Sequence, residues 1–120
     1  MRPKRKILTD QEFAIMKVVW RLQPVTVRGV YEEMLKERKI AYTSVMTVLN
    51  IMTRKKYLKR SKVKGGFVYE ARVSEQSTSG RMVRDLVDRA FAGSPSALML
   101  SLLETGDVDA QEIQRFCLMF

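Results

Sequence analysis

The sequence contains no histidine, and its 120 residues include a single cysteine, Cys117. The missing histidine excludes Ser-His and Cys-His nucleophile pairs, the commonest general base and the usual zinc ligand. One cysteine cannot supply an internal disulfide framework, or the several thiolates that a soft metal needs. Because the carboxylates are also scattered singly, no catalytic constellation is evident. We therefore predict a protein that is not an enzyme and that needs no metal or cofactor.

Long apolar runs are missing as well. No stretch of about 18 apolar residues occurs, which argues against a membrane-spanning helix. The basic segment 1–6 is not followed by the apolar stretch of a secretory signal. We expect a cytoplasmic protein that does not insert into a membrane. Its length fits one small domain, or a compact domain with an appendage.

Negative charge is scarce in the first part of the chain. Residues 1–72 carry 18 Lys and Arg against 6 Asp and Glu, whereas residues 73–120 carry 4 against 7. No acidic residue occurs over 38–69, and seven of the eleven residues 54–64 are basic. Such a block can be a solvated face, but charges of one sign repel one another and favour an anionic partner. The pattern favours a nucleic-acid surface, with an anionic membrane surface as the alternative.

Helical periodicity predicts three helices before the basic block. The first begins at a capping box, Thr9 to Glu12, and Pro24 ends it. The second spans Thr26–Arg38, and the third spans Tyr42–Lys55 with an apolar stripe on one side. The opposite face of the third helix is polar but nearly uncharged, as a helix needs if it reads base edges in a DNA groove. That face carries Thr43, Ser44, Thr47, Asn50 and Arg54.

Two extended runs, 58–64 and 67–73, follow the third helix. Gly65 and Gly66 stand between them and can supply positive φ at both positions of a tight turn. We therefore predict a β-hairpin, whose first strand and tip are basic and suited to gripping phosphate. Its basic residues are Lys59, Arg60, Lys62 and Lys64.

The rest of the chain predicts a second part. The Ser-rich segment 75–80 is interpreted as a hinge, and helical spacing predicts helices over 82–91, 95–104 and 110–120. We place a DNA-binding domain at 1–73 and a helical dimerisation domain at 74–120. So short a tail cannot bury a core alone, so we expect it to pack against a second copy. The alternative is that it folds back on the first half. The predicted anchors are Leu86, Phe91, Leu98, Leu102, Leu103, Ile113 and Phe116.

Three helices followed by a basic hairpin form a winged helix-turn-helix, so the predicted fold is mainly α with a small β-hairpin wing. Residues 8–20, 25–31, 41–50, 66–70 and 109–113 resemble the penicillinase-repressor family of bacterial transcription factors, which includes the BlaI, MecI and CopY types. The resemblance covers nearly the whole chain. It implies a dimer that binds a palindromic operator in double-stranded DNA and represses transcription.

Carried over by position, the resemblance places the recognition helix on Tyr42–Lys55. It implies base-edge or near-base contacts from Thr43, Ser44 and Thr47. The implied phosphate contacts are Arg54, Lys62 and Lys64, with Arg28 near the DNA backbone.

The sequence also departs from the family pattern. Members often have a glycine after the recognition helix, whereas here a lysine must adopt the left-handed conformation at this stop. Antibiotic-linked members are inactivated by cleavage at an Asn-Phe bond, which implies a membrane sensor protease as a partner. The matching residues here are Ser101 and Leu102. Copper-linked members carry paired Cys-x-Cys motifs, for which Cys117 alone cannot substitute.

The most economical interpretation is a dimeric, sequence-specific transcriptional repressor. One alternative is a non-specific architectural module that binds nucleic acid with the same basic wing. Another is an adaptor whose basic half binds an acidic protein or membrane surface. A footprint with two symmetric half-sites would distinguish the repressor from the architectural module. Binding that DNA does not compete away would favour the adaptor over both.

Overall fold

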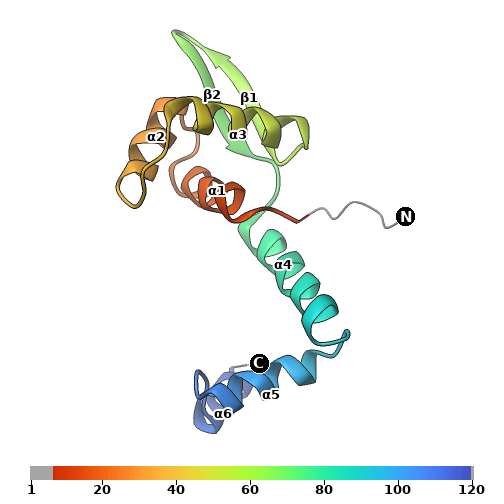
Figure 1. The fold of residues 1–120 in the computed structure, drawn as a ribbon. Helices are drawn as coiled ribbons and strands as arrows, with labels where there is room; N and C mark the ends of the chain where they lie inside the picture. Colours follow the sequence, from red (N-terminus) through yellow and green to blue (C-terminus); the bar gives the residue numbers. More distant parts are fainter. Residues whose placement is uncertain (1–6, 120) are drawn as a thin grey trace, which may run out of the picture. The chain divides into compact units, whose positions relative to one another are not determined.

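A computed structural model describes residues 7–119 of the chain (Figure 1). It has a mainly helical fold with one antiparallel two-stranded hairpin, which confirms the predicted fold class. The chain forms two compact units that divide between Gly80 and Arg81, called unit 1 and unit 2 below. The elements in order are α1 (Asp10–Leu22), α2 (Val27–Leu35), α3 (Tyr42–Arg54), β1 (Leu58–Val63), β2 (Gly66–Ala71), α4 (Glu75–Ala90), α5 (Pro95–Thr105) and α6 (Ala110–Leu118).

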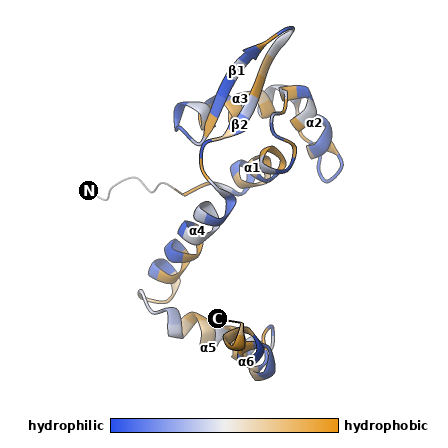
Figure 2. Ribbon diagram, turned by 180° about the vertical axis from the view of Figure 1, so that it is seen from behind, coloured by the Kyte–Doolittle hydropathy of each residue, from blue (hydrophilic) through white to orange (hydrophobic). Residues whose placement is uncertain are grey.

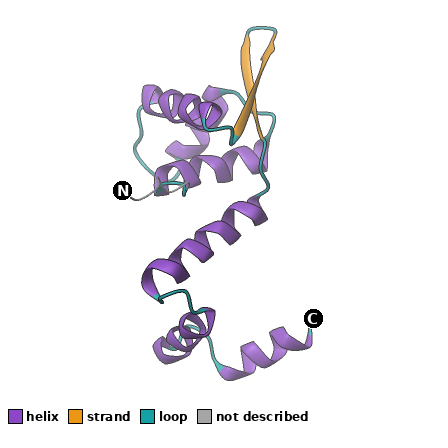
Figure 3. Cartoon of the chain, turned by 90° about the vertical axis from the view of Figure 1, so that its right-hand side faces the viewer, coloured by secondary structure: helices purple, strands orange, loops and turns teal. Residues whose placement is uncertain are grey.

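Unit 1 is built around one hydrophobic core, which α1, α2 and α3 share with the base of the hairpin. The predicted apolar stripe of α3 lies in it, because Val45, Val48, Leu49 and Met52 are all buried. Figure 3 shows the hairpin projecting beyond the three helices. The largest completely buried side chains are Ile15, Met16, Val19, Val30, Val45, Leu49, Met52 and Leu58.

The predicted capping box forms at the start of α1. Thr9 Oγ1 accepts a hydrogen bond from the Glu12 backbone N–H at 3.1 Å, and the Thr9 N–H donates to Glu12 Oε1 at 2.9 Å. The other carboxylate oxygen of Glu12 lies 3.2 Å from Lys55 Nζ, just beyond α3. Glu12 is buried, so one side chain both caps α1 and ties it to the end of α3.

Helix α2 is shorter than predicted, because it ends at Leu35 rather than at Arg38. The residues just after Leu35 are charged and exposed, so no burial of apolar side chains favours a longer helix. Lys36 Nζ instead lies 2.9 Å from Glu33 Oε1. Its hydrogen bond to Glu33, with the added charge of Arg21, holds the pKa of that carboxyl below its ordinary value.

The start of α2 is tied to the hairpin. The backbone groups of Val25 and Tyr69 exchange two hydrogen bonds, of 3.1 and 2.8 Å, in an isolated β-bridge. A Cβ at position 29 would lie 2.8 Å from Val25 Cγ2. Glycine at position 29 therefore permits α2 to approach the residue that holds β2.

The hairpin turn lies one residue earlier than predicted. Val63 pairs with Gly66, so the two turn residues are Lys64 and Gly65. Both glycines have positive φ, 91° and 151°, but Gly66 is already the first residue of β2. A turn with positive φ only at its second central position is of type II, and it accepts a lysine at the first position.

The segment 75–80, which was predicted to be a Ser-rich hinge, is helical and forms the first part of α4. Ser74 accounts for the difference. Its Oγ accepts the Ser77 N–H at 3.0 Å, and its carbonyl oxygen accepts both the N–H and the hydroxyl of Thr78. The hydroxyl groups therefore begin and support a helix where their number suggested a break.

Helices α5 and α6 begin at Pro95 and Ala110 as predicted, but α5 ends one residue later than predicted, at Thr105, and α6 ends at Leu118, before the predicted end at residue 120. Ser94 caps α5 through the Ala97 N–H at 3.2 Å, and Gly106 ends that helix in the left-handed conformation, with φ of 82°. Asp109 and Glu112 form the capping box of α6. Although both helices begin at well-formed N-caps, neither has a buried residue within the described part of the chain.

Candidate nucleic-acid interface

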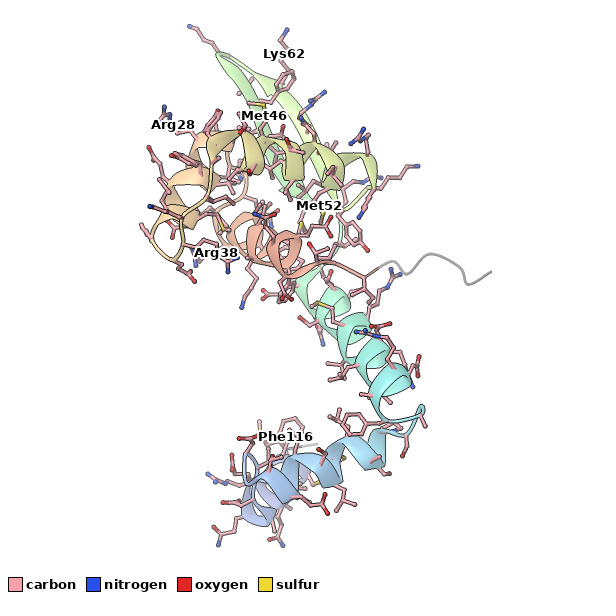
Figure 4. The ribbon with its side chains drawn as sticks, viewed as in Figure 1. Arg28, Arg38, Met46, Met52, Lys62 and Phe116 are labelled. Carbon is pink, nitrogen blue, oxygen red and sulfur yellow. The ribbon has the colours of Figure 1, made fainter. Side chains whose placement is uncertain are left out.

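Helix α3 presents the predicted polar face on the surface of unit 1. Thr43, Thr47 and Arg54 are exposed, whereas Ser44 and Asn50 are partly buried. Met46, which was not among the predicted site residues, belongs to the same surface and is 39% exposed. Figure 4 shows Met46 on the upper side of α3, where Arg28 and Lys62 also lie, and Met52 on its lower side toward the core. The helical periodicity had placed Met52, but not Met46, in the apolar stripe of α3.

A groove of about 550 Å³ lies between the start of α2, α3 and the hairpin. Of the predicted site residues, the structure brings Arg28, Asn50 and Lys64 together along this groove. Arg60, one of the basic hairpin residues predicted to suit phosphate, lines it too, as do three residues that were not among the predicted contacts: Tyr42, Met46 and Phe67.

A second hollow, of about 400 Å³, lies on α3 toward its C-terminal end. Thr47 and Arg54 line it, with Asn50 and Arg60 common to both hollows. The polar face of α3 therefore borders one hollow surface on each side of Asn50. Thr43, Ser44 and Lys62 line neither hollow.

Asn50 also connects α3 to the hairpin. The hydroxyl of Tyr69, a residue that is almost completely buried, donates a hydrogen bond of 3.4 Å to Asn50 Oδ1. Together with the bridge between Val25 and Tyr69, this contact ties the base of the hairpin to both helices of the helix-turn-helix. Nothing in the sequence indicated this contact, because the two residues belong to different elements.

The basic side chains of this surface fall into two groups. Lys55 pairs with the buried Glu12 at 3.2 Å, and Arg28 pairs with the exposed Glu32 at 3.4 Å. In contrast, no carboxylate of residues 7–119 forms an ion pair with the exposed cations that continue from α3 into the hairpin, and Figure 2 shows β1 mainly in the hydrophilic colour. Cations gathered without counter-charges attract an anionic partner. These are Arg54, Lys59, Arg60, Lys62 and Lys64.

The chain turns from α3 into β1 through a left-handed lysine, as predicted. Lys56 has φ of 69°, and the Tyr57 N–H donates to the Met52 carbonyl oxygen at 3.0 Å. This is the hydrogen bond of a Schellman ending, which glycine usually provides. A residue with a Cβ pays roughly 1 kcal/mol for this conformation. The turn directs the basic strand β1 away from the end of the helix.

Unit 2 has a different kind of surface. Leu86, Leu102, Leu103 and Phe116 of the predicted anchors are exposed, whereas Phe91, Leu98 and Ile113 are partly buried. Among its described residues, only Asp85 and Val87 are buried. Further large apolar side chains are exposed beside the anchors: Val83, Met99, Leu100, Leu118 and Met119.

Three packed helices, of which the third presents a polar face beside a basic hairpin, define a winged-helix DNA-binding protein. Comparison with known families then identifies the particular class. A profile of the penicillinase repressor family matches residues 8–117, so the chain belongs to that family. It is accordingly a transcriptional repressor and not an enzyme.

The relatives of the chain span most of its length. It is 31% identical to the transcriptional regulator BlaI of Mycobacterium tuberculosis, over 90% of this chain and 80% of that protein. It is 18% identical to the penicillinase repressor of Staphylococcus aureus, over 95% of this chain and 90% of that protein. It is 20% identical to the methicillin resistance regulatory protein MecI of Mammaliicoccus sciuri, over 89% and 87%.

Two further findings concern other kinds of site. Within residues 7–119, no helix combines the length and the apolar character needed to cross a membrane. The same residues contain no group of three or more His, Cys, Asp or Glu side chains that could hold a metal ion, and Cys117 is an exposed free thiol.

Proposed function

We propose that the protein is a dimeric repressor that binds a palindromic operator through α3 and the hairpin. The observation that carries the proposal is the uncharged polar face of α3, which lies beside cations without carboxylate partners in the described residues. A helix of this kind fits the major groove and can read base edges there. The residues up to Val73 would form the DNA-binding domain, and residues 74–120 would form the dimerisation domain.

The two kinds of side chain would have separate roles. Thr43, Ser44, Thr47 and Asn50 would face base edges, where hydroxyl and amide groups discriminate between bases. The cations would contact phosphates, which supply affinity and set the register but do not read sequence. These phosphate contacts are Arg28, Arg54, Lys62 and Lys64.

Dimerisation would cover the apolar surface of unit 2. Phe116 is 61% exposed and Leu102 and Leu103 are also exposed in the single chain. A large exposed apolar surface is typical of an interaction site. A second copy supplies a surface of matching character through a two-fold axis. The same axis would present two recognition helices to two half-sites, which is how a symmetric protein reads a palindrome.

The experiment is a selection of bound duplexes from a random library, followed by footprinting of the selected sequence. We expect two symmetric half-sites and two chains per duplex. The alternative, a non-specific architectural module, predicts no enrichment of any sequence. Binding to acidic proteins or anionic vesicles that excess DNA does not displace would favour the adaptor instead.

The proposal extends to the way in which the repressor is released. The family resemblance implies a membrane sensor protease that inactivates the repressor in the cytoplasm. Ser101 and Leu102, which replace the Asn-Phe bond of antibiotic-linked members, lie inside α5, so we expect cleavage at a different bond. Mass spectrometry of the protein from cells before and after treatment with a β-lactam would reveal the fragments, and an intact chain throughout would contradict this part of the proposal.

A further inference from the structure

Arg60 lies where the two hollows of the α3 surface meet. It is on β1 opposite Tyr69, and it lines both the groove of about 550 Å³ and the hollow of about 400 Å³. Only Asn50, in the second half of α3, shares this property among the residues that line the two. Arg60 is therefore beside the recognition helix, whereas Lys64 is at the turn of the hairpin.

An aromatic ring holds the Arg60 side chain. The guanidinium carbon is 4.4 Å from the centroid of the Phe67 ring. Phe67 pairs with Lys62, so Phe67 and Arg60 are diagonal neighbours on one face of the hairpin. The ring is 42% exposed and so contributes little to the core. Its position is explained by the cation that it supports.

The hydrogen-bond donors of Arg60 are not used by the rest of the described chain. Within residues 7–119, no carboxylate pairs with Arg60 and no hydrogen bond of its guanidinium is present. Contact with a ring face leaves the N–H groups at the edge of the guanidinium plane accessible. These groups form a fork that matches two oxygens of a phosphate.

We propose that Arg60 binds a DNA phosphate in the groove between α3 and the hairpin, and that Phe67 is the residue that positions it. This inference rests on the proposed function. If α3 enters the major groove, the hairpin lies over the adjacent sugar-phosphate strand, and that strand passes along the groove which Arg60 lines. A phosphate, rather than a base edge, is then the group within reach of the guanidinium.

The test uses the full-length protein with the selected operator duplex and a random duplex, with affinities measured over a range of KCl concentrations. Arg60→Gln should weaken both duplexes by similar factors and should flatten the slope of log K against log salt by about 0.9, as the loss of one phosphate contact does. Phe67→Leu keeps the charge, so it should leave the slope unchanged and weaken both duplexes by about 2- to 5-fold. Phe67→Tyr should retain binding.

The double variant tests the positioning role. When Arg60 is already Gln, Phe67→Leu should cost no further affinity, because there is no guanidinium left to hold. Lys17→Gln is the matched control. Lys17 lies over the Phe13 ring at 5.5 Å on α1, so this change removes the same charge and the same kind of ring contact away from the two hollows. It should leave the slope unchanged, and thermal unfolding should show that all variants remain folded.

Three results would overturn the inference. An unchanged slope for Arg60→Gln would remove Arg60 from the DNA contacts. A loss on the operator alone would make Arg60 a base reader. Equal losses for Phe67→Leu in both backgrounds would deny the positioning role. If the unmodified protein shows no preference for any sequence, the proposal of a specific repressor fails separately, and the Arg60 contact is still decided on random DNA.

Discussion

Unit 1 buries most of its large apolar side chains wholly or in part, whereas unit 2 leaves most of its own exposed. In unit 1, the three helices direct Ile15, Val30 and Leu49 into a core from which water is completely excluded, and they leave mainly polar and basic groups outside. In unit 2, α5 and α6 have no buried residue within the described chain, and leucine, methionine and phenylalanine side chains are on the surface. Unit 1 therefore has a core of its own, whereas unit 2 leaves most of its large apolar side chains exposed in the single chain.

The two units also differ in the charge that their residues carry. The cations of unit 1 are concentrated over 54–64 and have few counter-charges, while the later part of the chain is slightly acidic. A basic surface binds phosphate, and an apolar surface with little charge binds another apolar surface. The difference supports the proposal that unit 1 binds DNA and that unit 2 self-associates, and each part of the proposal can be tested separately.

The largest expected effect is on the core of unit 1. Leu49→Ala removes a completely buried side chain, and such changes cost about 2–5 kcal/mol of unfolding free energy. Urea denaturation should show this loss at every protein concentration, because the core of unit 1 lies within one chain. Leu22→Ala, at an exposed position on α1, is the control and should change the stability little. A loss that depended on concentration would mean that unit 1 is not independent.

Unit 2 should respond in the opposite way. Leu103→Asp places a charge on the exposed apolar surface and should convert the dimer to a monomer in sedimentation experiments. Operator affinity should then fall by about 100-fold or more, because the second half-site no longer adds to binding through effective concentration.

A chain truncated after Gly80 should behave in the same way, since it retains all of α1, α2, α3 and the hairpin. The truncation after Gly80 keeps two residues that contribute to unit 1. The carbonyl oxygen of Val73 accepts the Trp20 indole N–H at 2.9 Å, and Thr78 is buried. If the truncated chain still sediments as a dimer, the dimer interface lies in unit 1 and the comparison fails.

Local signals in the sequence were sufficient to predict most of the elements. The capping box at Thr9 and the left-handed lysine after α3 each depend on residues within a few positions of one another. The errors were local as well. The serines of 75–80 were interpreted as a hinge, although a serine at a helix start caps it, as Ser74 does.

The contacts that organise the candidate interface could not be predicted in this way. The pair of Lys55 with Glu12 and the hydrogen bond of Tyr69 to Asn50 join residues that only the folded chain brings together. The neighbours of Arg60 could not be predicted either, because they depend on the hairpin register. The predicted turn was one residue too late in the sequence, so the predicted strand pairs were wrong. The polar face of α3 was visible because it depends on helical periodicity alone.

A smaller effect should separate specificity from affinity within unit 1. Thr47 is exposed on α3 and lines the second hollow. Thr47→Ala should cost roughly 1–3 kcal/mol on the operator and little on random DNA, because it removes a base-edge contact but no charge. Competition titrations with both duplexes measure this difference. Equal losses on both would mean that Thr47 only positions the helix on the backbone.

The smallest effects are expected at the end of the hairpin, where Lys62 and Lys64 are exposed and have no ion pair in the described chain. Lys62→Ala and Lys64→Ala should each weaken operator and random DNA by similar factors, and each should flatten the slope of log K against log salt by about 0.9. Neither change should alter the oligomeric state, since self-association is assigned to unit 2. The two variants also locate the DNA, because Lys64 is in the turn whereas Lys62 is opposite Phe67 on the strand. A changed slope for Lys64→Ala alone would place the phosphates at the turn, and an unchanged slope in both would remove the end of the hairpin from the interface.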